Sequence, residues 1–136
     1  MKKSAALILL YAFCLSAQGA EWRKIVARAD FDAYVDVSRI RWSGEVASVW
    51  KLMDYRLPQQ EESFVYSSGK VRTEHDCARE RHRTTFVVVY STELGMGEVV
   101  TAVDKSQARW QPIIPGSVGE AVHKFICNWK PFLGPT

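Results

Sequence analysis

The segment from Pro115 to Trp129 carries the pattern that most constrains the fold of this chain. Ser117 is a favourable helix N-cap, and Glu120 follows three residues later, as in a capping box. Apolar residues then recur with the spacing of an amphipathic α-helix, at Val118, Ala121, Val122, Phe125, Ile126 and Trp129. We expect the exposed face to carry Glu120, His123, Lys124 and Asn128. A short helix is marginal without tertiary packing, so this one should lie on a β-sheet.

The N-terminal residues have the organisation of a secretory signal peptide. Two lysines precede a short apolar run, and small residues follow it. The run is shorter than the ~20 apolar residues of a membrane-spanning helix, which disfavours a retained anchor. We therefore predict a signal peptide at residues 1–20, cleaved after Gly19 or Ala20. Lipidation at Cys14 is an alternative, although a bulky residue precedes this cysteine.

The remaining residues, 21–136, are predicted to form a single exported domain, periplasmic or on the cell surface. The whole chain has 18 basic and 15 acidic side chains, and the leader contains two of the lysines and no acid. The mature chain therefore has 16 basic and 15 acidic groups, a net charge of about +1. This balance gives no support for nucleic acid as a partner.

Two cysteines, Cys77 and Cys127, remain after removal of the leader. In an oxidising compartment such a pair favours a disulfide, which would attach the terminal helix to the sheet. The alternative is a metal site in which His75 and His82 join the two cysteines. Their spacing matches no compact zinc motif, so we expect the disulfide and no metal.

The chain between leader and helix alternates β-prone segments with turn residues. The first two strands should form a hairpin and the last three a meander, with 82–92 near the centre of the sheet. Residues 45–55 also fit helical spacing, but their β-branched and aromatic content favours a strand. We expect a short 3₁₀ piece at 37–41, turns at 42–44 and 68–69, and a mobile loop at 56–63. The predicted strands are 21–29, 31–37, 45–55, 66–78, 82–92 and 98–104. The fold class is therefore α+β, with about six antiparallel strands.

A local excess of basic side chains lies in and after the fourth predicted strand. Alternation places Val71, Thr73, His75 and Cys77 on the face that the helix covers, and the charged residues on the other. The pattern is typical of a solvated strand face and turn with weak mixed ion pairs. The functional interpretation is a contact patch for an acidic partner surface. The basic residues are Lys70, Arg72, Arg79, Arg81 and Arg83, and the acids among them are Glu74, Asp76 and Glu80.

The sequence contains no recognisable catalytic constellation. Residues 116–119 lack the Gly-x-Ser-x-Gly pattern of a nucleophile elbow, and Ser117 is better explained as a helix cap. The glycines at 95 and 97 are too few for a phosphate loop and do not precede a helix. We therefore expect neither an enzyme nor a cofactor.

A set of residues distributed along the predicted mature chain forms a recognisable pattern: Trp22, 34–36, Ile40, 49–52, 54–55, 76–78, 115–117 and Cys127. The pattern resembles the surface-adhesin protein E family of bacterial envelope proteins. The resemblance implies a curved antiparallel sheet, a C-terminal helix tied to one face by Cys77–Cys127, and adhesion to host matrix or plasma proteins. A second hypothesis is a periplasmic accessory or enzyme-inhibitor protein that acts through the loop at 56–63.

Overall fold

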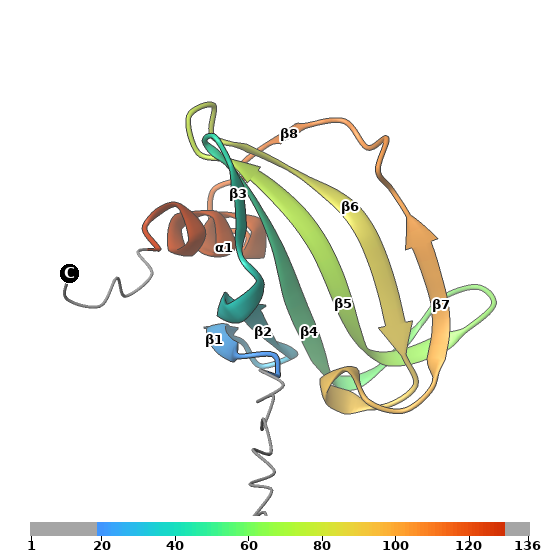
Figure 1. The fold of residues 1–136 in the computed structure, drawn as a ribbon. Helices are drawn as coiled ribbons and strands as arrows, with labels where there is room; N and C mark the ends of the chain where they lie inside the picture. Colours follow the sequence, from blue (N-terminus) through green and yellow to red (C-terminus); the bar gives the residue numbers. More distant parts are fainter. Residues whose placement is uncertain (1–18, 130–136) are drawn as a thin grey trace, which may run out of the picture.

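The computed structural model describes residues 19–129 of the chain. Nearly all of the predicted signal peptide, including Cys14, lies outside the described residues. Within them, one antiparallel β-sheet and one C-terminal α-helix form the architecture (Figure 1), and no helix there is long and apolar enough to cross a membrane. The elements are β1 (Trp22–Ala27), β2 (Phe31–Asp36), η1 (Val37–Arg39), β3 (Arg41–Ser43), β4 (Val46–Gln60), β5 (Val65–Asp76), β6 (Arg81–Tyr90), η2 (Glu93–Gly95), β7 (Val99–Asp104), β8 (Gln111–Pro112) and α1 (Val118–Cys127).

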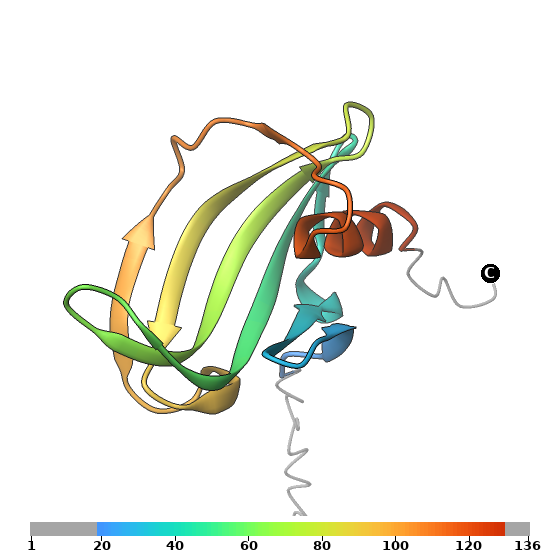
Figure 2. The ribbon, with the colours of Figure 1, turned by 180° about the vertical axis from the view of Figure 1, so that it is seen from behind.

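The strands form a single open sheet in the order β1-β2-β4-β5-β6-β7, with β3 paired to β4 and β8 paired to β6. This order confirms the expected β1–β2 hairpin and the β5–β6–β7 meander. The centre is formed by β4 and β5, so the strand that we expected there, β6, instead adjoins the edge strand β7. The sheet curves strongly, and α1 lies at the end away from the β4–β5 hairpin tip (Figures 1 and 2).

The prediction of a mobile loop at residues 56–63 is wrong. Strand β4 continues through Pro58, and Gln59 pairs with Tyr66 of β5. The strand accommodates the proline because the register is irregular between Asp54 and Gln59, where the ladder does not require a proline N–H. Most of this polar segment therefore extends the β4–β5 hairpin. The hypothesis of an enzyme inhibitor that acts through a free loop at 56–63 is not supported by this geometry.

The turn predicted at 68–69 is wrong, the turn predicted at 42–44 is shifted to 44–45, and η1 confirms the expected 3₁₀ piece. Gly69 continues β5 and pairs with Met53 and Val89 on the neighbouring strands. A Cβ at this glycine would lie 3.3 Å from Val89 Cγ1, so the sheet is closely packed there. Trp42 belongs to β3, and the chain reverses at Gly44, whose φ of 58° suits glycine.

Alternation along the strands gives the sheet two different faces. We call the face that α1 covers the helix face and the other the opposite face. The helix face contains Thr73 and His75, and the opposite face contains Lys70 and Arg72, as predicted. The helix face has the cross-strand rows Ala47–His75–His82 and Val49–Thr73–Thr84. The opposite face has the rows Trp50–Arg72–Phe86 and Leu52–Lys70–Val88.

The helix begins and packs largely as its sequence predicts. Ser117 Oγ accepts a hydrogen bond from Glu120 N–H at 3.1 Å. The Glu120 carboxylate accepts from Gly116 N–H at 3.4 Å, so the reciprocal bond of the capping box is displaced by one residue. Val122 and Ile126 are fully buried, and each such side chain contributes about 1.5–3 kcal/mol. They pack in one core with Val35, Ala47 and Val49.

The disulfide prediction is confirmed, since Cys77 and Cys127 are bonded with their Cα atoms 5.7 Å apart. The bond joins the chain just after β5 to the last residue of α1. The prediction that His123 is exposed is wrong, because only 7% of this residue is accessible. Its ring lies 5.4 Å from that of His75, so the helix buries a polar residue beside its apolar stripe.

Candidate functional site

The opposite face contains several cations that lie against aromatic rings. Each of four basic side chains there lies within 6 Å of at least one ring centroid, the range of a cation–π interaction. The cations come from β5 and β6, and the rings from four different segments of the chain. The set comprises Lys70, Arg72, Arg81 and Arg83, with Trp22, Trp50, Phe86, Tyr90 and Trp110.

Arg72 occupies the middle of this face. Its guanidinium lies 5.8 Å from the Trp50 ring and 5.9 Å from the Phe86 ring. Its Nε donates to Thr85 Oγ1 at 3.0 Å, and that hydroxyl donates to the Arg72 carbonyl oxygen at 3.3 Å. Thr85 is the additional residue at the register shift between β5 and β6, so a bulge provides this partner. Arg72 is therefore held in a fixed position between two rings.

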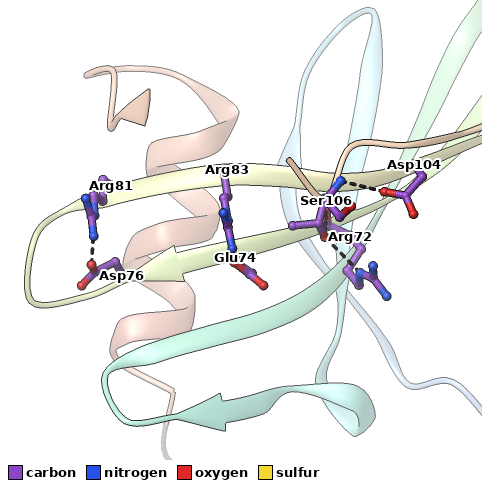
Figure 3. A network of polar contacts seen from close by, with 8 residues as sticks. Arg72, Glu74, Asp76, Arg81, Arg83, Asp104 and Ser106 are labelled. Atoms are coloured by element: carbon purple, nitrogen blue, oxygen red, sulfur yellow. Dashed lines mark hydrogen bonds and ion pairs between the residues drawn. The ribbon is translucent and has the colours of Figure 1, made fainter. Parts of the chain in front are cut away.

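Two arginines at the start of β6, beside the β5–β6 turn, pair with acidic residues of β5 (Figure 3). Arg81 Nε donates to Asp76 at 3.0 Å, and Arg83 Nε donates to Glu74 at 2.7 Å. Both guanidinium groups also lie 4.7 Å from the centroid of the ring of Trp110, the residue just before β8.

Asp76 is the acceptor that organises this turn. It is 3% exposed and also accepts from Arg79 N–H at 3.1 Å. Burial acts to raise the pKa of its carboxyl, but the Arg79 N–H and the Arg81 guanidinium lower that pKa below its ordinary value. The turn is therefore a rigid structure in which the carboxylate lies beneath the cations.

The five basic residues of the predicted patch therefore share one face without forming one cluster. Lys70 lies among rings near η2, Arg72 is in the middle, and the other three are at the turn. Arg79 projects furthest, with 72% of its side chain exposed, against 33% for Arg81 and 27% for Arg83. Asp76 forms ion pairs with Arg79 and Arg81, both of them at the turn.

A cavity of about 260 Å³ opens on the same face, beside Lys70. Sequence reasoning did not find it, because its walls come from segments that are distant along the chain. The sequence signal that was available is the spacing of Phe86 and Tyr90, which alternation places on one face of β6. The lining residues are Trp22, Arg39, Trp50, Lys70, Val88 and Tyr90.

The residues of the alternative metal site lie together but are otherwise engaged. Both cysteine sulfurs form the disulfide, and residues 19–129 contain no cluster of three or more ligating side chains placed to hold a metal ion. The histidines instead stack, with His75 5.7 Å from His82 and 5.4 Å from His123. The metal alternative is therefore not supported by this geometry.

The disulfide fixes the direction of a buried hydrogen-bond chain. His123 Nε2 lies 3.6 Å from Cys127 Sγ, and a disulfide sulfur has no hydrogen, so this nitrogen is the donor. In a neutral ring His123 Nδ1 then accepts from His75 Nδ1–H at 3.2 Å. His75 Nε2 accepts from the Thr73 hydroxyl at 3.0 Å. Burial, with repulsion from His123, His82 and Lys51, lowers the pKa of His75 to about 3, which keeps it neutral.

Fold and site together define a class of protein: a small α+β domain whose helix is anchored by a disulfide on one face of an open sheet, leaving the other face free for contacts. The chain belongs to the surface-adhesin protein E family, whose sequence pattern matches residues 22–128. No curated protein sequence matches the chain.

Solved structures of Haemophilus influenzae protein E have the same fold. Crystal form II is 13% identical, with a TM-score of 0.58, over 81% of this chain and 96% of the other. The selenomethionine form is 14% identical, with a TM-score of 0.55, over 81% of this chain and 92% of the other. The family and the fold implied by the sequence resemblance are thus confirmed.

Proposed function

We propose that this chain is an exported, adhesin-like binding protein of the cell envelope, without enzymatic activity, that contacts a host matrix or plasma protein. The observation that carries the proposal is the family match, which spans residues 22–128 and so covers nearly all of the predicted mature domain. The structures of Haemophilus influenzae protein E support the shared fold at 13–14% identity. The partner itself is inferred from the family.

The β5–β6 turn is the contact surface that we favour for a protein partner. Arginine and tryptophan are enriched at the centres of protein interfaces, and Trp110 with the three arginines provides both. The carboxylate of Asp76 and most of Glu74 lie below the surface, with side chains 4% and 26% exposed, whereas Arg79 faces outward. A partner would therefore meet a positive surface whose groups are already ordered, which reduces the entropy lost on binding.

Capture of immobilised host matrix and plasma proteins tests this surface. The variant Arg79→Gln/Arg81→Gln/Arg83→Gln should weaken capture and flatten its dependence on salt, because steering by exposed charge is screened by ions. A matched control, Arg23→Gln/Lys105→Gln/Lys124→Gln, removes the same charge elsewhere and should keep both properties.

Since Arg81 and Arg83 neutralise carboxylates, thermal denaturation must first show that the triple variant is folded. Arg79→Gln alone, at the most exposed position, provides a second test in an intact turn. Unchanged capture and salt dependence in both variants would exclude the turn as the contact surface.

A further inference from the structure

The cavity beside Lys70 is built from parts of the fold that the protein-binding surface does not use. Its floor is formed by Lys70 and Val88, which are directly paired across β5 and β6. Val88 is 8% exposed and gives the floor an apolar surface. Trp50 and Tyr90 lie to either side along their strands, and Trp22 of β1 closes the wall.

Lys70 is held in place by the loop that contains η2. Gly95 approaches so closely that a Cβ there would lie 2.5 Å from Lys70 Cε. The loop is fastened to β5 through Ser68, whose hydroxyl donates to Thr92 O at 2.6 Å and accepts from Gly95 N–H at 2.8 Å. The lysine stem is therefore confined, and its ammonium group is directed between two rings, 5.1 Å from Tyr90 and 5.9 Å from Trp22.

Within the part of the chain that the structure describes, the ammonium group of Lys70 has no carboxylate partner. None of the ion pairs within residues 19–129 includes it, and none of the residues that line the cavity is acidic. The second cation of the cavity, Arg39, is fixed by Asp36 at 3.2 Å, and that aspartate is fully buried. The cavity thus combines an ordered, uncompensated positive charge with three aromatic rings and an apolar floor.

We propose that this cavity binds an anionic sugar, one pyranose residue that carries a carboxylate or a sulfate. The C–H face of a pyranose would stack on the rings of Trp22, Trp50 and Tyr90, while its acidic group pairs with Lys70. The volume of about 260 Å³ lies below the ~300–1,000 Å³ of sites for drug-sized ligands, which suits a single sugar residue. An extended acidic peptide would need a groove or a strand edge instead. The site is independent of the proposed protein contact.

Isothermal titration of the purified protein with a sulfated disaccharide of a uronic acid and an amino sugar tests the proposal. We expect saturable binding at one site, and none of a neutral disaccharide of the same size. Lys70→Gln should weaken binding about tenfold or more, because it removes a charge-assisted hydrogen bond. Lys70→Arg should retain most of the affinity, and the control Lys105→Gln all of it.

Several outcomes would overturn the assignment. Equal affinity for inorganic sulfate would show a simple anion site, and competition by a tetraglutamate peptide would show a peptide site. Full binding by Lys70→Gln would place the sugar elsewhere; if that variant is unfolded, Trp22→Leu replaces it as the test. The triple arginine variant at the β5–β6 turn should bind the disaccharide normally, so failure of the protein-contact proposal can be distinguished from failure of this one.

Discussion

Mild acid is expected to destabilise this domain through the histidines beneath α1. His75 is 1% exposed, and its pKa is lowered from 6.5 to about 3 by burial and by the neighbouring cationic groups. Below pH 6.5 the unfolded chain therefore binds a proton that the folded protein excludes. Stability is complete above the unfolded value and falls as the pH decreases toward the folded one.

The magnitude follows from linkage. Each pH unit between the unfolded and folded pKa values contributes about 1.4 kcal/mol, so a change from pH 7 to pH 5 removes about 2 kcal/mol through His75 alone. Burial also lowers the pKa values of His82 and His123, which act in the same direction. The chain has 3 histidines in total, so no other histidine contributes in this range. Hydrogen bonds from Arg56 and Lys24 lower the pKa of the Asp32 carboxyl, so this group stays charged between pH 7 and pH 5.

Urea denaturation at pH 7 and pH 5, on the wild type and on His75→Gln, measures the effect. The variant loses polar contacts and should be less stable at pH 7, but the difference between its two free energies of unfolding should be smaller by about 2 kcal/mol. An unchanged wild-type stability between the two pH values would refute the reasoning. So would a variant that keeps the full pH dependence.

Three further changes test the packing of the domain. Replacing Cys77 and Cys127 together with alanine should lower the free energy of unfolding by about 4 kcal/mol in urea denaturation, since their sequence separation of 50 defines a long closed loop; a loss below ~1 kcal/mol would contradict this. Gly119→Ala would ordinarily stabilise a helix by ~1 kcal/mol. Here it should lower the Tm, because the new Cβ would lie 2.9 Å from His82 Cε1, and a higher Tm would show that this contact relaxes. Asp36→Ala should cost about 1–3 kcal/mol in thermal denaturation by leaving the N–H groups of Glu21 and Ser38 unpaired, and an unchanged Tm would exclude this role.

The terminal helix, the β1–β2 hairpin and the β5–β6–β7 meander could be predicted because local patterns determine them. The apolar stripe that includes Val122 and Ile126 predicts one buried face of the helix, and both residues are fully buried. The position of His123 could not be read in this way. Its polarity suggested the exposed face, but its neutral ring forms hydrogen bonds with His75 and with the sulfur of Cys127. His75 comes from a distant strand, and the sulfur is an acceptor because it belongs to the disulfide.

The errors in the middle of the chain have a similar origin. The segment 56–63 is polar and contains Pro58, so local composition favours a loop, yet β4 continues to Gln60, and Gln59 and Gln60 pair with β5. The sequence predicts the basic patch as a group of charges, whereas the environment of each basic residue depends on the side chains that contact it. Arg72 between Trp50 and Phe86, and Lys70 in its cavity, depend on cross-strand register, which a single strand does not encode.

Protease treatment of intact cells, followed by detection of the domain, tests the proposed adhesin-like role most directly. A contact surface for a host protein is useful only if it is accessible outside the cell, so the account predicts loss of the domain when protease is added to intact cells. The control is an envelope protein known to face the periplasm, which should be retained. Complete protection of the domain in intact cells, with digestion only after the outer membrane is opened, would contradict adhesion and favour a periplasmic accessory protein.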